Sequence, residues 1–165
     1  RRPAWRVKVG EESITFRDLL QGEYKEDLKT DCGDFILRRS DGVYAYQLAV
    51  VVDDGAMGVT QVVRGSDLLS STPRQIYLQR LLGLPEPEYG HVPLLLSADG
   101  RRLAKRDRDQ ELGELQSRYT APELLGRLAH LARLIPEPVP MTAQELIPLF
   151  SWEKLQREDI KVEKF

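Results

Sequence analysis

The stretch Leu48-Ala49-Val50-Val51-Val52 is a continuous run of apolar and mostly β-branched side chains. An uninterrupted run of this length suits a strand that is covered on both faces, as in a parallel α/β sheet. The polar residues and the glycine of Asp53-Asp54-Gly55 follow at once and favour the end of a strand there. We therefore predict a buried strand over residues 48–52 and an α/β fold class.

The residues that follow continue this α/β pattern. Residues 59–63 are rich in β-branched side chains and predict a second strand. The segment Thr72-Pro73-Arg74-Gln75 predicts a helix start, with its threonine as the cap, its proline at the first position and its glutamine completing a capping box. Gly83 predicts the end of that helix, and residues 92–96 predict a strand with a proline near its start. Residues 43–97 are thus expected to run strand, strand, helix, strand.

The segments on either side have a different character. Upstream, residues 5–17 predict a β-hairpin that turns at Gly10-Glu11-Glu12, and residues 34–38 predict a further strand. The polar residues 18–33 between them are expected to be mostly loop. Downstream, the sequence predicts helices over 110–117, from Thr120 to Arg133 and from Thr142 to near Phe150. The last two begin with a threonine followed three residues later by a glutamate, a capping box. The charged tail 153–165 is expected to be only partly ordered.

The composition excludes several classes of protein. The 165 residues fit one domain with at most a small appendage, and an apolar fraction of 41% supports a core. A net charge of −2 argues against nucleic-acid binding by the surface as a whole, so a basic patch would have to be local. No apolar stretch approaches the ~18 residues of a membrane helix, and no signal peptide is visible. The single cysteine, Cys32, excludes an internal disulfide, and together these features favour a cytoplasmic protein with no membrane partner.

A basic loop stands out in this slightly acidic chain. It follows the predicted strand 92–96 and the turn 97–100, and holds five cations around one acid: Arg101, Arg102, Lys105, Arg106 and Arg108. Arginine and lysine are the donors that meet phosphate oxygen, so the loop predicts phosphate binding. The alternative is a solvated charged turn, because no glycine-rich phosphate cradle accompanies it.

Two residues near the predicted strands are candidates for a small-molecule site. Tyr46 precedes the first strand and Arg64 follows the second, and open α/β sheets place ligands at strand ends. An arginine can hold a carboxylate through two parallel hydrogen bonds. The alternative is a packed tyrosine and a surface arginine. His91 leads into a strand and receives no role, and one cysteine with two separated histidines predicts no metal site in this chain.

Three segments together resemble the class I glutamyl-tRNA synthetase family. They are residues 41–54, residues 63–75 and Arg102-Leu103-Ala104-Lys105-Arg106, which is similar to the mobile KMSKS loop of these enzymes. The resemblance implies the second half of a Rossmann-like catalytic domain followed by a small helical stem-contact region. It further implies three parts: an inserted β-rich segment at 1–40, the second Rossmann half at 41–100, and the KMSKS-like loop with the stem-contact helices at 101–165.

The resemblance also implies the roles of the candidate residues. Lys105, with Arg102 and Arg106, would stabilise the ATP phosphates as pyrophosphate leaves, and Tyr46 and Arg64 would bind glutamate. ATP is then expected with Mg2+. The family's HIGH motif, and a zinc site that many members carry, would lie upstream of this chain, so we expect a fragment that is inactive by itself. Arg102 and Ala104 depart from the family's lysine and serine.

One segment distinguishes branches within the family. Ordinary glutamyl-tRNA synthetases commonly read R-G-E-D-H where this chain reads Arg64-Gly65-Ser66-Asp67-Leu68. That departure is typical of the branch that attaches glutamate to queuosine in the anticodon of tRNA(Asp), so we expect that tRNA as partner and a monomeric protein. The alternatives are an ordinary glutamyl-tRNA synthetase acting on tRNA(Glu), a non-catalytic RNA-binding paralogue, and a generic α/β nucleotide-binding domain.

Overall fold

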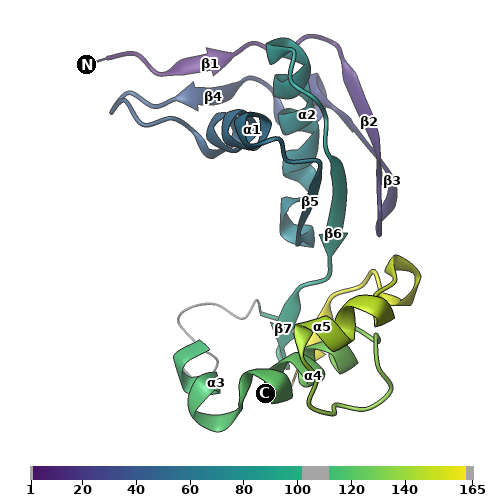
Figure 1. The fold of residues 1–165 in the computed structure, drawn as a ribbon. Helices are drawn as coiled ribbons and strands as arrows, with labels where there is room; N and C mark the ends of the chain where they lie inside the picture. The colour runs from purple at the N-terminus through teal and green to yellow at the C-terminus, as the bar shows by residue number, and fades with distance from the viewer. Residues whose placement is uncertain (1, 102–111, 163–165) are drawn as a thin grey trace. The chain divides into compact units, whose positions relative to one another are not determined.

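The computed structural model describes residues 2–101 and 112–162, and the chain forms two compact units, Arg1–His91 and Val92–Phe165 (Figure 1). Both contain helices and strands, so the fold is mixed α/β as predicted. In the described ranges, no helix is both long enough and apolar enough to cross a membrane.

The first unit begins with two antiparallel strand pairs. Strand β1 (Trp5–Val7) pairs with β4 (Phe35–Arg38), and β2 (Ser13–Asp18) pairs with β3 (Gly22–Asp27). A π-helical turn, η1 (Leu28–Cys32), leads from β3 to β4. The strand predicted at 34–38 is therefore confirmed, whereas the hairpin predicted over 5–17 and the loop predicted over 18–33 are wrong.

The pairing partners explain this difference. Strand β3 is mostly charged, with Tyr24 as its one aromatic side chain, and carries little apolar signal. Tyr24 nevertheless lies opposite Phe16 of β2, with their ring centroids 5.7 Å apart. The β2–β3 turn is closed by the Asp18 carboxylate, which accepts hydrogen bonds from the backbone N–H groups of Leu20 (2.9 Å) and Gln21 (2.8 Å). A hairpin of this kind depends on cross-strand contacts rather than on alternation within one strand.

The run that suggested a buried strand is a helix. Helix α1 (Tyr46–Met57) contains residues 48–52 and ends at Gly58, whose φ of 69° is left-handed. Within the run, Val51 is 2% exposed but Val52 is 44% exposed, so only one face of the helix enters the core. A short apolar run does not distinguish a strand from a buried helix segment, and here the helix is correct.

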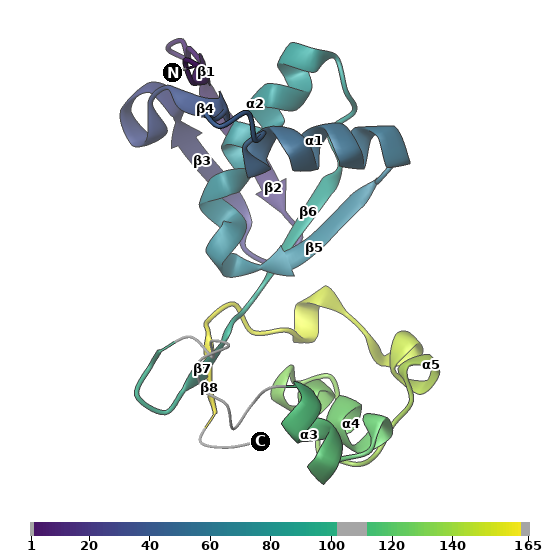
Figure 2. The same ribbon diagram turned by 90° about the vertical axis from the view of Figure 1, so that its left-hand side faces the viewer.

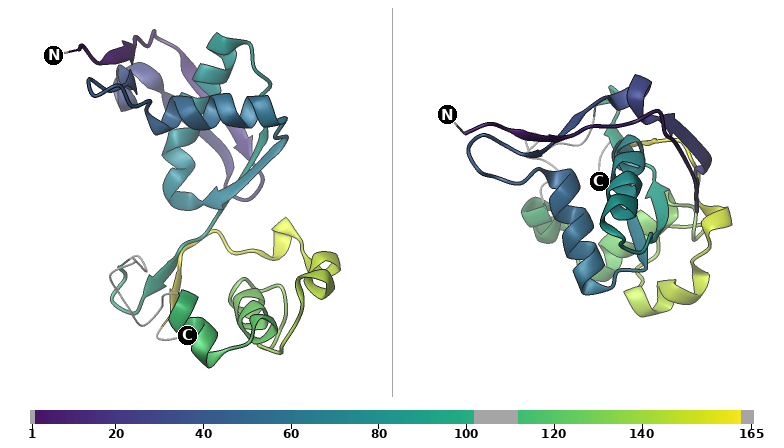
Figure 3. Two further views of the ribbon diagram at one scale, coloured as in Figure 1. Left: turned by 60° about the vertical axis from the view of Figure 1, so that its left-hand side comes forward. Right: turned by 90° about the horizontal axis from the view of Figure 1, so that it is seen from above.

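Helix α1, strand β5 (Gln61–Gly65), helix α2 (Thr72–Leu82) and strand β6 (Glu88–Val92) follow one another. The observed order is therefore helix, strand, helix, strand. β5 and β6 are hydrogen-bonded neighbours and lie side by side beneath α1 in Figure 2. The helices α1 and α2 pack against each other and cross in Figure 3. The core between these elements contains the buried side chains Ile14, Leu28, Val51, Ile76, Leu78 and Tyr89.

The helix predicted from residue 72 is confirmed, but its predicted cap is wrong. Thr72 already has helical dihedral angles (φ −59°, ψ −44°), and a 3₁₀ turn, η2 (Ser66–Ser71), runs directly into α2. The Thr72 hydroxyl is engaged elsewhere, so it does not cap the helix. The predicted helix end is confirmed at Gly83, which has a φ of 64°.

Among its described residues, the second unit contains a strand pair and three helices. Strand β7 (Leu95–Ser97) pairs in parallel with β8 (Ile160–Val162), so the tail predicted to be partly ordered contains a strand. The predicted strand 92–96 is divided between β6 and β7 at Pro93, which has no N–H for a ladder. The helices are α3 (Leu112–Arg118), α4 (Ala121–Leu131) and α5 (Ala143–Leu146), the last followed by the 3₁₀ turns η4 (Ile147–Leu149) and η5 (Trp152–Lys154). Of the three predicted capping boxes, those of Thr120 with Glu123 and of Thr142 with Glu145 are confirmed.

Gly126 in α4 is a point of close backbone packing. A Cβ atom added there would overlap the Val139 carbonyl oxygen and would lie 2.7 Å from the carbonyl carbon. We expect Gly126→Ala to lower the free energy of unfolding by about 1–3 kcal/mol, because the 136–140 segment must move. Urea unfolding followed by circular dichroism measures this. Gly113→Ala in α3 is the matched control, since no atom lies within 4 Å of its added Cβ; equal losses in both variants would contradict the packing argument.

Candidate active site

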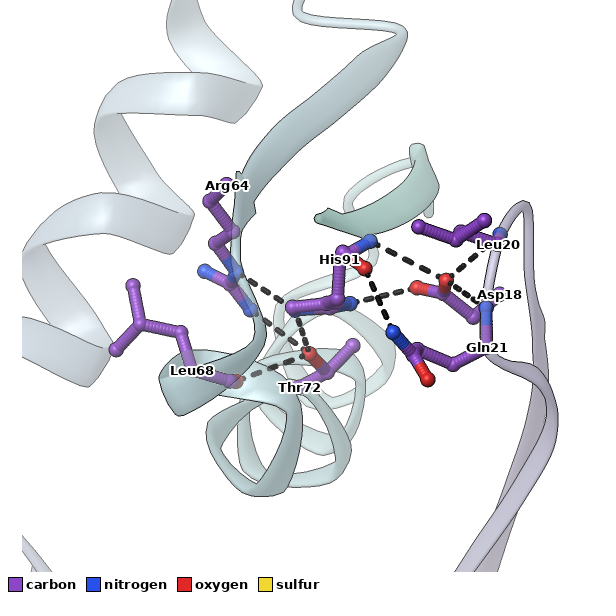
Figure 4. Close-up of polar contacts among 7 residues, drawn as sticks. All are labelled: Asp18, Leu20, Gln21, Arg64, Leu68, Thr72 and His91. Carbon is purple, nitrogen blue, oxygen red and sulfur yellow. Dashed lines mark hydrogen bonds and ion pairs between the residues drawn. The ribbon is translucent and has the colours of Figure 1, made fainter. Parts of the chain in front are cut away.

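A fully buried carboxylate–imidazole pair joins β2 to β6 in the first unit (Figure 4). Asp18 is the last residue of β2 and His91 lies in β6, and both side chains have no solvent-exposed surface. Asp18 Oδ2 and His91 Nδ1 are 2.6 Å apart. The other carboxylate oxygen, Oδ1, accepts hydrogen bonds from the backbone N–H groups of Leu20, Gln21 and His91. Every oxygen of this buried carboxylate is therefore hydrogen-bonded, as burial of a charge requires.

Opposing influences act on the Asp18 carboxyl. Burial is the largest single influence and raises its pKa, because a charged group loses hydration. The hydrogen bonds from the His91 ring and from the backbone of Gln21, Leu20 and His91 together outweigh burial, so the pKa lies below its ordinary value. Asp18 is consequently a carboxylate at neutral pH.

Arg64 in β5 is joined to the far side of the imidazole. Its Nε–H donates to His91 Nε2 at 3.0 Å, and Nη2 donates to Thr72 Oγ1 at 2.8 Å. A guanidinium has donors and no acceptor, so Nε2 of the imidazole must be the acceptor and the ring proton must lie on Nδ1, facing Asp18. The buried contacts thus form an ordered series from Asp18 through His91 to Arg64 (Figure 4).

The same contacts leave one edge of the Arg64 guanidinium for a ligand. Nε and Nη2 face His91 and Thr72, whose ring nitrogen and hydroxyl oxygen are themselves 3.2 Å apart. The outer edge, formed by Nη1 and the second N–H of Nη2, is directed away from Nε. Among the described residues no hydrogen bond engages Nη1. That outer edge has the geometry to hold a carboxylate through two parallel hydrogen bonds.

The Tyr89 ring supports the arginine from another direction. The Arg64 guanidinium carbon lies 5.4 Å from its ring centroid, and Tyr89 stacks on His91 with the two rings 15° from parallel. Arg64 is half-buried, so the alternative of a simple surface arginine is wrong. It was predicted to follow the strand 59–63 but lies within β5, one residue before the last residue of that strand.

Tyr46 occupies a different position from the one predicted. It is the first residue of α1 instead of preceding a strand, and its side chain is 53% exposed. The alternative of a packed tyrosine is therefore also wrong. Among the described residues, no hydrogen bond joins Tyr46 to Arg64. The neighbouring Gln47 connects this end of α1 to α2, because its amide donates to Ser71 Oγ (3.1 Å) and accepts from Gln75 Nε2 (2.8 Å).

The predicted phosphate-binding residues Arg102, Lys105 and Arg106 lie outside the described residues. The turn that precedes them is described and is tightly hydrogen-bonded. Asp99 Oδ2 lies 2.6 Å from Arg101 Nε, and hydrogen bonds from Ser97 and then Arg101 lower the pKa of Asp99 to about 2. Gly100 closes the turn with a φ of 81°. Part of the basic charge predicted from the sequence is thus paired with Asp99.

His91 and Asp18 are the site residues that sequence reasoning did not find. They are 73 positions apart, and neither lies in a recognisable motif with the other. The only local signal is an aspartate directly before a turn, which is common in proteins. Over residues 2–101 and 112–162 no group of three or more His, Cys, Asp or Glu side chains could hold a metal ion.

The lowered pKa of Asp18 predicts that the protein loses stability in acid. Its pKa is lowered on folding, so its contribution is complete above the ordinary value of 3.8 and is lost as the pH falls below 3.8 through the folded-state value. We expect the stability difference between the wild type and Asp18→Asn to be largest at neutral pH and to shrink below pH 3.8. Urea unfolding at several pH values measures this. A difference that stays constant down to pH 2 would contradict it.

The sequence comparisons define the class of protein. Residues 2–138 match the family described as tRNA synthetases class I (E and Q), catalytic domain, and the chain belongs to that family. Its fold agrees with that of the glutamate-tRNA synthetase from Elizabethkingia anophelis, with a TM-score of 0.78 over 94% of this chain and 35% of that one, at 22% identity.

Curated relatives point to a particular branch of this family. The chain is 48% identical over 161 residues to the Glutamyl-Q tRNA(Asp) synthetase of Symbiobacterium thermophilum, covering 97% of this chain and 50% of the relative. It is 53% identical over 152 residues to the protein of the same name from Nitratidesulfovibrio vulgaris, covering 92% of this chain and 47% of the relative. The chain thus spans about half the length of the curated relatives it matches.

Proposed function

We propose that this chain is part of an enzyme that activates glutamate with ATP and transfers it to queuosine in the anticodon of tRNA(Asp). The observation that carries the proposal is the 48% identity to a Glutamyl-Q tRNA(Asp) synthetase over 97% of the chain. The Ser66-Asp67-Leu68 segment, which replaces the E-D-H of ordinary glutamyl enzymes, supports the same branch. In this proposal residues 41–100 belong to the second Rossmann half, 1–40 to the insertion and 101–165 to the KMSKS-like loop and stem-contact region.

The proposed chemistry has two steps. A carboxylate oxygen of glutamate attacks the α-phosphorus of ATP, the bond to the β-phosphate breaks, and pyrophosphate leaves. Glutamyl-adenylate then transfers its acyl group to queuosine, and AMP leaves. Catalysis of such steps is mainly positioning and charge stabilisation.

Glutamate is the substrate that the described residues can hold. The outer edge of the Arg64 guanidinium is suited to a carboxylate, and its other edge is fixed by His91 and Thr72. We assign Arg64 and the exposed Tyr46 to glutamate binding. Lys105, assisted by Arg102 and Arg106, is assigned to the ATP phosphates, with Mg2+ accompanying the nucleotide.

Glutamate-dependent ATP–pyrophosphate exchange by the full-length protein that contains this chain tests the proposal. Exchange without any tRNA supports the queuosine-directed enzyme, because ordinary glutamyl enzymes of this family generally need tRNA to activate glutamate. Exchange only in the presence of tRNA would instead favour an ordinary synthetase. Transfer of labelled glutamate to tRNA(Asp) that contains queuosine, but not to queuosine-free tRNA(Asp) or to tRNA(Glu), identifies the acceptor.

Lys105→Ala separates an enzyme from a non-catalytic RNA-binding protein. We expect pyrophosphate exchange to fall about 100-fold, as when one charge-stabilising donor is removed from a transition state. A pure RNA binder would show no exchange in the wild type, and the substitution would weaken only its salt-dependent RNA affinity. This chain by itself serves as the control and is expected to be inactive.

A further inference from the structure

We propose that His91 is a positioning residue for Arg64 and that Asp18 fixes the orientation of His91. The inference rests on the proposed function, in which Arg64 binds the carboxylate of glutamate. It deepens that function by assigning a role to two buried side chains that do not themselves need to contact any substrate. The roles follow from the atoms that meet in Figure 4.

Arg64 needs an external restraint to be an effective binding group. A free arginine side chain has several rotatable bonds, and a ligand that fixes it loses affinity through the entropy of ordering. Here the Nε–H is held by His91 Nε2 at 3.0 Å and Nη2 is held by Thr72 Oγ1 at 2.8 Å. With one edge fixed at two atoms, the planar guanidinium has a single orientation, so the direction of its outer edge is set before the ligand arrives.

The imidazole can act in this way only if Nε2 carries a lone pair. Asp18 ensures this, because its Oδ2 lies 2.6 Å from Nδ1 and keeps the ring proton on Nδ1. The ring is further held by the backbone: the His91 N–H donates to Asp18 Oδ1 at 3.2 Å, and the His91 carbonyl accepts from Gln21 Nε2 at 3.0 Å. The Asp18 carboxylate thus orients the His91 imidazole, and the imidazole in turn orients the Arg64 guanidinium.

Two substitutions of His91 separate this role from simple core packing. In His91→Gln the side-chain amide oxygen reaches the place of Nε2 and can still accept from Arg64, whereas the contact with Asp18 is lost. In His91→Asn the amide nitrogen lies near the place of Nδ1 and can still donate to Asp18, whereas the acceptor for Arg64 is lost. If His91 only satisfies the buried Asp18, His91→Asn is the milder variant; if it positions Arg64, His91→Gln is the milder variant for glutamate binding.

The experiment measures KM and kcat in pyrophosphate exchange by the full-length protein, with glutamate and ATP varied separately. We expect His91→Asn to raise KM for glutamate about tenfold, with kcat and KM for ATP little changed, because a binding contact is weakened in ground and transition state alike. His91→Gln should keep KM for glutamate within about threefold of the wild type, because its amide oxygen still accepts the hydrogen bond from Arg64. Unchanged glutamate KM in His91→Asn, or equal changes for glutamate and ATP, would overturn the proposal.

A second measurement does not depend on activity. The Arg64 Nε–H resonance, observed by ¹⁵N–¹H NMR in the same proteins, should exchange slowly with water in the wild type and in His91→Gln and rapidly in His91→Asn. A wild-type protein that shows the protected resonance but no glutamate-dependent ATP–pyrophosphate exchange would disprove the proposed function. The inference that His91 orients Arg64 would still hold. Equal protection in all three proteins would show that His91 does not hold Arg64, whatever the activity.

Discussion

Replacing Arg64 with alanine should lower kcat/KM for glutamate in pyrophosphate exchange by about 100- to 10,000-fold. A bidentate arginine–carboxylate contact contains two charge-assisted hydrogen bonds, and each contributes roughly tenfold to a hundredfold. The prediction depends on the outer edge of the guanidinium, because the inner edge is already occupied by His91 and Thr72. Steady-state kinetics of the full-length protein, with glutamate as the varied substrate, measure it.

Two further variants make the Arg64 prediction specific. Arg64→Lys keeps the positive charge but has no planar fork, so we expect most of the loss to remain. Arg80→Ala in the same unit is the matched control, since its partner is Glu86 in an exposed ion pair and a near-neutral effect is expected. Because Arg64 also contacts His91 and Thr72, circular dichroism must show that the variant is folded. A folded Arg64→Ala protein with the same kcat/KM for glutamate as the wild type would contradict the assignment of Arg64 to glutamate binding.

Asp18→Ala should destabilise the protein by about 3–5 kcal/mol, the largest effect on folding that we expect from one side chain. The substitution leaves the His91 Nδ1–H and the backbone N–H groups of Leu20 and His91 without an acceptor in a buried place. Unpaired buried donors carry their whole desolvation cost. Urea unfolding of the wild type and the variant at neutral pH gives the difference.

Asp27→Ala is a closely matched control for Asp18→Ala. Asp27 also ends a strand, β3, and its carboxylate also accepts from the backbone N–H groups two and three residues later, at 3.1 Å from Lys29 and 3.0 Å from Thr30. It differs in being solvent-accessible and in lacking the histidine. We expect it to cost much less than Asp18→Ala, as for an exposed cap. Similar losses in the two variants would show that the buried pair with His91 adds no stability beyond the turn.

The sequence alone determined the features of this protein that depend on a few neighbouring residues. The capping boxes that begin at Thr120 and Thr142 and the helix end at Gly83 were predicted correctly, because each is formed within about one turn of helix. The resemblance of short segments to the glutamyl family was likewise readable from the residues and is confirmed by the family match. Arg64 was identified as a candidate in the same way.

The tertiary structure decided what depends on partners far away in the chain. The run at 48–52 is a helix instead of a strand, since a short apolar segment satisfies either and its packing environment selects one. Strand β1 pairs with β4 instead of forming a hairpin with residues 14–16, because strand partners are selected by cross-strand contacts, and β2 pairs with β3. The most consequential case is Arg64: the sequence supplied its charge, but only the folding of β2, β5, β6 and α2 brings Asp18, His91 and Thr72 to it. Hydrogen bonds across 73 positions have no local signature, and they fix which edge of the guanidinium is left for a ligand.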